Sequence, residues 1–303
     1  MKKTCIVLTG PTAVGKTALS IQLAQHFSTE IISADSRQCF TELNIGVAKP
    51  SNAELSLVPH HFINSHTIHE NVNAAVYEKY ALQAARDIFK KNDIALIAGG
   101  TGLYVKTFCE GIDEVPIILL GIRESIVASY EKNGIEWLQQ QVMEKDAAWY
   151  QQGEIKNPHR LMRALEVILS TNKSLLQFQT KEPVKRDFEI IKIGLELQRS
   201  ILYQRINERV VQMMKDGLEA EVRSLKPFRT LNALQTVGYK ELFNYFDDKS
   251  SLEEAVALIQ QNTRHYAKRQ LTWFKKDTAI KWCAPKFNEV LSKVNAAMQE
   301  ILE

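Results

Sequence analysis

The chain has 303 residues, of which 45% are hydrophobic and 24% are charged, and its formal net charge is +3. This composition excludes a disordered chain and provides apolar surface for one substantial core and a smaller lobe. No apolar run is long enough to cross a bilayer, and residues 1–3 lead into a short strand without the apolar stretch of a signal peptide. The four cysteines show no metal-ligand spacing. We therefore expect a cytoplasmic protein with no membrane contact.

Strands and helices alternate along the chain. In chain order, hydrophobic periodicity predicts a strand at 5–8, a helix at 15–27, a strand at 30–34, a helix at 72–91, strands at 94–98 and 190–197, and helices at 199–225 and 252–276. This alternation predicts an α/β fold in which a parallel sheet is covered by helices. In such folds, ligands bind beyond the carboxyl ends of the strands.

A phosphate-binding motif follows the first predicted strand. Residues 10–17 read G-P-T-A-V-G-K-T, which matches G-x-x-x-x-G-K-[ST]. The glycines let backbone N–H groups point inward, Lys16 adds a positive charge, and the Thr17 hydroxyl can hold Mg²⁺. The positive N-terminal end of the next helix faces the same anion. The motif predicts a P-loop-type sheet and a diphosphate site made by Gly10, Pro11, Thr12, Ala13, Val14, Gly15, Lys16 and Thr17.

Two further loops should meet the P-loop, because all three follow strands of the same parallel sheet. Residues 35–38 follow the second strand, and the sequence G-G-T-G-L-Y at 99–104 follows the central one. Asp35 could be a metal ligand, a helix N-cap or a general base. Thr101 could hydrogen-bond a substrate or cap the next helix.

The middle of the chain has a different character. Residues 113–156 are rich in glutamine and aromatic side chains, are mostly helical, and show no strand pattern or catalytic spacing. We predict a small helical insertion domain at 113–156 within a catalytic core made of residues 1–112 and 157–303. The insertion could act as a lid or as a packing lobe.

Positive charge gathers near the C-terminus. Residues 264–276 read R-H-Y-A-K-R-Q-L-T-W-F-K-K, with no acidic residue and three aromatic ones. On a helix, the basic and the aromatic side chains fall on different faces. The segment could be a solvated basic stripe beside a core stripe, or a surface that contacts phosphate backbones.

Together, these motifs resemble the tRNA dimethylallyltransferase family, whose members modify an adenosine next to the anticodon. Apart from the P-loop, no single motif is decisive, but their order along almost the whole chain is specific. The matching segments are GPTAVGKT at 10–17, ADSRQ at 34–38, AKP at 48–50, PHH at 59–61, GGTGLY at 99–104, RALEV at 163–167, R-x₂-L-Y-x-R-I-N-x-R-V at 199–210, GL-x-x-E-V at 217–222, VGYKEL at 237–242 and TRHYAKRQLTWF at 263–274.

The resemblance assigns roles to matching residues. It implies that the P-loop binds the diphosphate of dimethylallyl diphosphate, with Mg²⁺ near Thr17. It implies that Asp35 is the general base for the adenine amino group and that Thr101, Arg123 and Arg209 lie near the reacting groups. The residues that it places against tRNA are Asp35, Ser36, Arg37, Gln38, Thr101, Arg123, Arg160, Arg163, Tyr239, Lys240, Lys268, Arg269, Gln270, Trp273 and Lys275.

The implied activity is transfer of a dimethylallyl group to N6 of adenosine 37 in tRNA, with release of diphosphate, by a monomer. Three alternatives stay open at this point. They are a small-molecule or nucleotide kinase, an adenylate isopentenyltransferase that uses the same donor on a free nucleotide, and a P-loop RNA-binding protein without catalysis. The basic segment at 264–276 and the insertion favour a macromolecular acceptor.

The chain departs from the family pattern at several positions. The family has Asp where Asn44 and Asn64 stand, Thr where Val47 stands, and Tyr where Phe40 stands. It also has a His-Pro-Asn-Asp-like segment at residues 156–159. These departures weaken any role of the loop around residue 44, but the P-loop, the two other loops and the basic segment are intact. We therefore predict a working member of the family.

Overall fold

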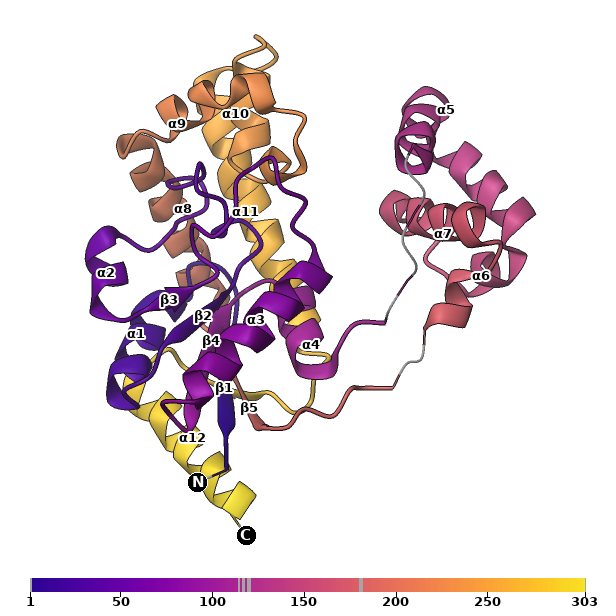
Figure 1. The fold of residues 1–303 in the computed structure, drawn as a ribbon. Coiled ribbons are helices and arrows are strands. Elements are labelled where there is room, and N and C mark those ends of the chain that lie inside the picture. The colour runs from indigo at the N-terminus through magenta and orange to yellow at the C-terminus, as the bar shows by residue number, and fades with distance from the viewer. Residues whose placement is uncertain (1, 114, 116–117, 119–120, 180–181, 303) are drawn as a thin grey trace. The chain divides into compact units, whose positions relative to one another are not determined.

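A computed structural model describes residues 2–113, 115, 118, 121–179 and 182–302. The chain forms two compact units, one made of Met1–Gly111 with Val184–Glu303 and the other of Ile112–Pro183. Figure 1 shows the path of the chain through both. In the part of the chain that is described, no helix combines the length and the apolar character needed to cross a membrane.

The first unit is built on a parallel sheet with the strand order β3-β2-β4-β1-β5-β6. The strands are β1 (Thr4–Thr9), β2 (Ile31–Ala34), β3 (His60–His61), β4 (Ile94–Gly99), β5 (Glu189–Leu195) and β6 (Lys281–Cys283). The predicted α/β fold with a parallel sheet is confirmed. The edge strands β3 and β6 were not predicted, because two or three residues are too few to show a period.

Helices cover both faces of the sheet (Figure 1). Those that pack on it are α1 (Lys16–His26), α3 (Ala74–Phe89), α4 (Gly102–Glu110) and α12 (Phe287–Leu302), and the short α2 (Asn52–Leu57) precedes β3. Successive strand residues point to opposite faces. Cys5 and Val7 therefore join one core with α3 and α4, whereas Ile6 and Leu8 join another with α1 and α12.

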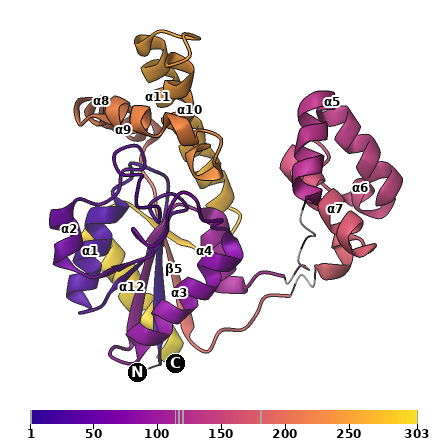
Figure 2. The same ribbon diagram turned by 45° about the horizontal axis from the view of Figure 1, so that its top comes forward.

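Four further helices stand together beyond the sheet (Figures 1 and 2). They are α8 (Arg199–Lys215), α9 (Leu218–Ser224), α10 (Tyr239–Tyr245) and α11 (Leu252–Phe274), with short 3₁₀ turns at Lys226–Phe228 and Asn232–Leu234. The single helix predicted at 199–225 is wrong. Gly217 has a φ of 100°, a left-handed conformation that ends α8 and lets α9 begin in a new direction.

The second unit is helical, as predicted, and has its own core. It contains α5 (Ile122–Lys145), α6 (Ala147–Gln152), α7 (Pro158–Thr171) and a 3₁₀ turn at Leu175–Phe178. Leu138 and Val142 of α5, Trp149 of α6 and Leu161 and Leu165 of α7 are buried together. Because α7 packs on α5, the unit extends to Pro183, and the boundary predicted after residue 156 lies too early. The helix α7 begins there because Asn157 caps it and Pro158 fills its first turn.

Candidate functional site

The P-loop joins β1 to α1 and has the backbone conformation that its glycines allow. Gly10 and Gly15 have φ values of 147° and 106°. A Cβ at Gly10 would lie 2.7 Å from the Leu195 carbonyl oxygen, so only glycine fits there. The Lys16 Nζ donates hydrogen bonds to the carbonyl oxygens of Gly10 at 2.9 Å and Pro11 at 2.8 Å. The Lys16 ammonium group is thus bound by the backbone of its own loop.

Two arginines of α8 reach the same loop. Arg209 donates from a guanidinium nitrogen to Thr12 Oγ1 at 3.3 Å, and Arg205 donates to the Val14 carbonyl at 3.4 Å. The two residues lie one helical turn apart, so both face the P-loop. Arg209 therefore lies at the P-loop, and its predicted place near the transferred group stays a prediction. Arg205 was not predicted as a site residue, although its spacing from Arg209 was a signal.

Burial shapes the electrostatics of these cations. Burial lowers the pKa of Lys16 to about 7, with Asp35 opposing the shift and Arg209 adding to it. Burial also lowers the pKa of Arg209, and Asp35 opposes that shift. A site that disfavours its own positive charges will favour an anion that compensates them. This is the environment expected of a diphosphate site.

Asp35 directly follows β2 and precedes a turn at residues 36–39. Its Oδ1 accepts hydrogen bonds from the backbone N–H groups of Arg37 at 2.8 Å and Gln38 at 3.2 Å. Among the described residues, no hydrogen bond reaches Oδ2. Of the roles considered for Asp35, capping is therefore present, but of a turn rather than of a helix, and one carboxylate oxygen is left for a substrate or a metal ion.

Gln38 and Thr101 fix the surroundings of Asp35. The Gln38 side chain donates to the carbonyl oxygens of Val47 at 3.3 Å and Ala48 at 3.0 Å. Thr101 Oγ1 accepts a hydrogen bond from the Ser36 N–H at 3.0 Å and makes no capping bond to α4. The two predicted loops therefore meet, as their places after neighbouring strands indicated.

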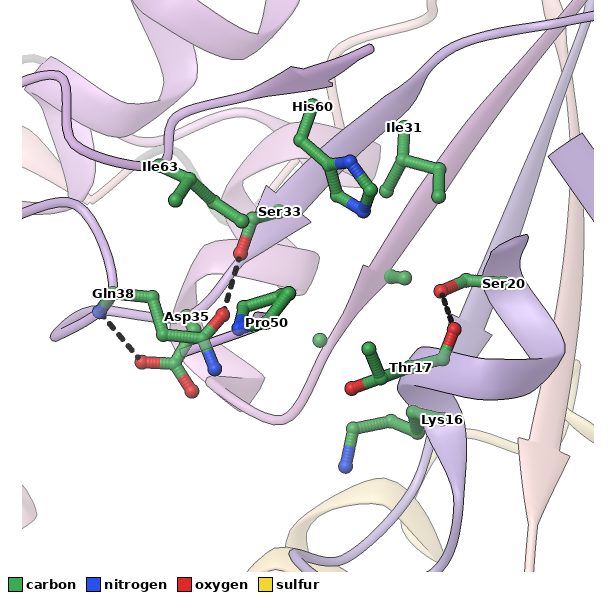
Figure 3. A pocket seen from close by; sticks show the side chains of 12 residues that line it. Lys16, Thr17, Ser20, Ile31, Ser33, Asp35, Gln38, Pro50, His60 and Ile63 are labelled. Atoms are coloured by element: carbon green, nitrogen blue, oxygen red, sulfur yellow. Dashed lines mark hydrogen bonds between the residues drawn. The ribbon is translucent and has the colours of Figure 1, made fainter. Parts of the chain in front are cut away.

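A pocket lies between the P-loop helix and these loops. Figure 3 shows Lys16 and Thr17 on one side of it, and Asp35, Gln38 and Pro50 on the other. The lining residues that the sequence did not single out include Ser20, Ile31, Ser33, His60, Ile63 and Ala98. Pro50 and His60 belong to the family motifs A-K-P and P-H-H, and these motifs could have indicated them as site residues. Apolar and polar side chains thus line the same space.

His60 is one of the polar groups of this pocket. Burial lowers its pKa, and the carbonyl oxygen of Val58 lies 2.9 Å from its Nδ1. The proton of the neutral ring therefore lies on Nδ1, because a carbonyl can only accept. His60 adds a neutral polar ring, not a charge, to the pocket.

The structure offers a partial site for a metal ion. Within the described residues, no group of three His, Cys, Asp or Glu side chains could hold one. Thr17 and Asp35 line the same pocket, however. Mg²⁺ commonly takes one or two protein oxygens and completes its shell with waters and phosphate oxygens. The residues present therefore fit an ion that arrives with a diphosphate.

The predicted basic segment lies in the last turns of α11 and in the two residues that follow it. Lys268, Arg269 and Lys275 have exposed side chains, as does Lys240 at the start of α10. The Trp273 side chain is 39% exposed. Lys275 is less available than the others, because its Nζ lies 3.0 Å from a Glu196 carboxylate oxygen.

Two residues predicted to contact tRNA are buried instead. Gln270 is 6% exposed and Tyr239 is 0% exposed. The Tyr239 hydroxyl donates to a Glu221 oxygen at 2.5 Å, and the same carboxylate accepts from the N–H groups of Ile45 and Gly46. Tyr239 therefore supports the loop whose carbonyls hold Gln38, and direct contact between its side chain and tRNA is ruled out in this conformation.

The three predicted arginines of the second unit form ion pairs there. Arg123 and Arg163 both pair with Glu166, and Arg160 pairs with Glu154 at 3.0 Å. Glu166 is buried, so its two arginines satisfy an otherwise costly charge. Their predicted roles beside the transferred group and on tRNA stay predictions.

The parallel sheet, with the P-loop at its carboxyl edge and cations around it, defines a P-loop protein with a site suited to a phosphate compound. A family model described as IPP transferase matches residues 38–277. The chain belongs to this family. The resemblance predicted from the motifs is thus confirmed.

Curated relatives carry the corresponding names. The chain is 46% identical to a tRNA dimethylallyltransferase of Christiangramia forsetii, over 93% of each sequence. It is 47% identical to one of Flavobacterium johnsoniae, over 92% of this chain and 93% of the relative. These relatives match the chain over nearly its whole length.

Solved structures agree with the family assignment. The tRNA isopentenylpyrophosphate transferase of Bacillus halodurans matches with a TM-score of 0.72 and 31% identity, over 99% of this chain and 96% of the other. A eukaryotic dimethylallyltransferase acting on tRNA matches with a TM-score of 0.77 and 26% identity, over 93% of this chain and 74% of the other. Both matches extend over the two units of the chain.

Proposed function

We propose that the protein transfers a dimethylallyl group from dimethylallyl diphosphate to N6 of adenosine 37 in tRNA and releases diphosphate. One observation carries this proposal. Lys16 of the P-loop and Asp35 lie on opposite sides of a single pocket, so a diphosphate donor and a nucleophile could meet there. The family to which the chain belongs supports the same reaction.

The donor side would be held by the P-loop. Its backbone N–H groups, Lys16 and Arg209 would bind the diphosphate, and they would stabilise the charge that grows on it as the bond to C1 breaks. Thr17 is the residue that would hold Mg²⁺, which would neutralise part of the same charge when bound. Apolar residues of the pocket, such as Ile31 and Ile63, suit the hydrocarbon group.

The acceptor side would be served by Asp35. The adenine N6 is a weak nucleophile because its lone pair is delocalised into the ring, so it needs close alignment with C1 and loss of a proton. As the N6–C1 bond forms and the C1–oxygen bond breaks, the N6 proton passes to Asp35 Oδ2 and the diphosphate leaves with the bonding electrons. The turn that holds Oδ1 would keep the carboxylate in place.

The exposed basic face of α11 would contact tRNA phosphates, and the target base would leave its stack to reach the pocket. Drawing a base out of a stack costs a few kcal/mol. The cytoplasmic location and the monomeric state expected from the sequence stay predictions.

One labelling experiment tests the proposal. The protein is incubated with Mg²⁺ and radiolabelled dimethylallyl diphosphate, together with unmodified tRNA or with AMP. We expect label in tRNA alone. Label in AMP would favour an adenylate isopentenyltransferase. Tight tRNA binding without labelling would favour an RNA-binding protein, and phosphate transfer from ATP to a small acceptor would favour a kinase.

Loss of basic residues from α11 should reduce the salt dependence of tRNA binding. If Lys268 and Arg269 each contact a phosphate, replacing both with Ala should flatten the slope of log affinity against log salt by roughly 0.7 to 0.9 per contact. We expect less from Lys275→Ala, because Lys275 pairs with Glu196. Affinity is measured at several salt concentrations, with the exposed Lys79→Ala as a control. An unchanged slope in the double variant would mean that the stripe is only solvated.

Donor binding should weaken as the pH rises. The pKa of Lys16 is about 7 in the free protein, and a bound diphosphate should raise it because an opposite charge favours the ammonium form. Above that pKa, binding must take up a proton, so the donor Kd should rise by up to about tenfold per pH unit. Calorimetry in two buffers of different ionisation heat measures both the Kd and the proton uptake. Lys16→Met should abolish the uptake; a native protein that binds without it would contradict this assignment.

A further inference from the structure

A single buried amide joins two of the loops that carry the site. Gln270 lies in α11, within the basic segment, but its side chain points inward. Its Oε1 accepts a hydrogen bond from the Thr12 N–H at 2.8 Å, and its Nε2 donates to the Gly100 carbonyl at 2.8 Å. The P-loop and the loop after β4 are thus tied to the same side chain.

The loop after β4 approaches side chains of α11 closely at two glycines. A Cβ at Gly100 would lie 2.3 Å from Gln270 Nε2, and a Cβ at Gly102 would lie 2.2 Å from Trp273 Cδ1. Gln270 and Trp273 are three positions apart, which places them on one face of the helix. The contact between this face and the loop is therefore specific in shape as well as in hydrogen bonding.

The same loop leads to the candidate base. Thr101 follows Gly100, donates its N–H to the Ala34 carbonyl at 3.0 Å, and accepts from the Ser36 N–H at 3.0 Å. Ala34 and Ser36 flank Asp35. A displacement of Gly100 would therefore be passed to the carboxylate, whereas a displacement of Thr12 would be passed to the diphosphate cradle.

We propose that Gln270 is a positioning residue that holds the donor cradle and the base-bearing loops at a fixed separation. This inference rests on the proposed function. An amide suits the role because it combines one acceptor and one donor in a rigid plane, and because both partners are backbone groups that need satisfying when buried. In the proposed reaction, the bridge would align C1 of the donor with N6 of the acceptor.

A positioning role differs from a merely structural one in what it changes. A misplacement of about 1 Å can cost about 10²-fold in rate while both substrates still bind. A structural role would lower the melting temperature or both affinities and leave the rate at saturation unchanged. The measurement that separates them is the single-turnover transfer rate at saturating substrates, beside the Kd for each substrate.

The first test is Gln270→Met, which keeps the length of the side chain but removes both hydrogen bonds. We expect the saturating rate to fall by about 10²-fold, with both Kd values within about threefold of native. Gln261→Met, at an exposed position of the same helix, is the matched control. A native protein that labels tRNA beside a Gln270→Met variant of equal rate would overturn the inference; a native protein that labels nothing would overturn the proposed function instead.

The second test breaks the bridge from its other end. Gly100→Ala places a Cβ against Gln270 Nε2, and it remains informative if Gln270→Met fails to fold. If both variants act through one bridge, the double variant should be about as slow as the slower single variant. Rate losses that multiply would show two independent defects and overturn the inference. Amide hydrogen exchange at Thr12 adds a readout without activity: it should accelerate in Gln270→Met, and unchanged protection would exclude the bridge.

Discussion

Replacing Asp35 with Asn should slow the transfer step by roughly 10²- to 10⁴-fold, the usual contribution of a general base. The substitution is well matched to the structure. An asparagine side chain can still accept the hydrogen bonds from the N–H groups of Arg37 and Gln38 that now reach Oδ1. The turn should persist while the proton acceptor is lost. Single-turnover transfer of labelled dimethylallyl to tRNA measures the effect, with the Kd of each substrate determined separately.

Asp35→Ala provides the comparison. It removes the turn bonds as well as the base, so it should be at least as slow as Asp35→Asn and should also bind substrate less well. If Asp35 served only to cap the turn, Asp35→Asn would keep the native rate and Asp35→Ala alone would be defective. The pair therefore separates the two roles that one carboxylate could play.

Elements of the fold were predictable from the sequence where a local pattern determines them, and were missed where packing between distant residues does. The strands β1, β2, β4 and β5 are buried apolar runs next to clear turn signals, so each was predictable by itself. The break between α8 and α9 depends on the conformation of Gly217, and a helical pattern can run through a glycine when packing permits. The extent of the second unit depends on α7 packing against α5, a contact that local periodicity does not contain.

The site shows the same division. The P-loop and the two loops beside it come together because parallel strands end at one edge, which the sequence predicts. The burial of Tyr239 and Gln270 was missed, because the family resemblance placed both side chains against tRNA. Their partners, Glu221 for one and two backbone groups for the other, lie far away in the sequence.

Three of the residues that depart from the family pattern are compatible with the observed contacts of their loop. Val47 contributes its backbone carbonyl to Gln38, and a hydroxyl on its side chain is not needed for that. Asn64 Oδ1 accepts a hydrogen bond from Lys49 Nζ at 2.5 Å, a contact that an aspartate could also make. Phe40 is 3% exposed, so an apolar ring fits its surroundings. The carbonyl oxygens of this loop therefore still accept hydrogen bonds from the Gln38 side chain.

Lys16→Met should nearly abolish transfer while making the protein without substrate more stable. The Lys16 ammonium group donates to two carbonyl oxygens of the P-loop. A bound diphosphate would neutralise its positive charge. Loss of one preorganised donor to developing charge typically slows turnover by about 10²- to 10³-fold. Donor affinity should fall as well, whereas tRNA affinity should stay near native. A collapse of tRNA binding in this variant would show that Lys16 does not serve the donor.

The stability change should depend on pH in a defined direction. Burial lowers the pKa of Lys16 from 10.5 to about 7 in the folded protein, so the unfolded chain binds the proton more tightly. Native stability should therefore rise with pH between these values, and the cost of the buried ammonium should be complete below about pH 7.

Methionine has no such cost, although it gives up the bonds to Gly10 and Pro11. The stability gained by Lys16→Met should be largest near pH 6.5 and should shrink toward pH 9.5, when urea unfolding is compared at both with that of the native protein. Addition of dimethylallyl diphosphate should reverse the order, because the native protein would bind it more tightly and so gain more stability by mass action. A variant that is less stable than native at every pH would contradict this prediction. It would mean that the hydrogen bonds of Lys16 stabilise the folded protein by more than desolvation of its ammonium group costs.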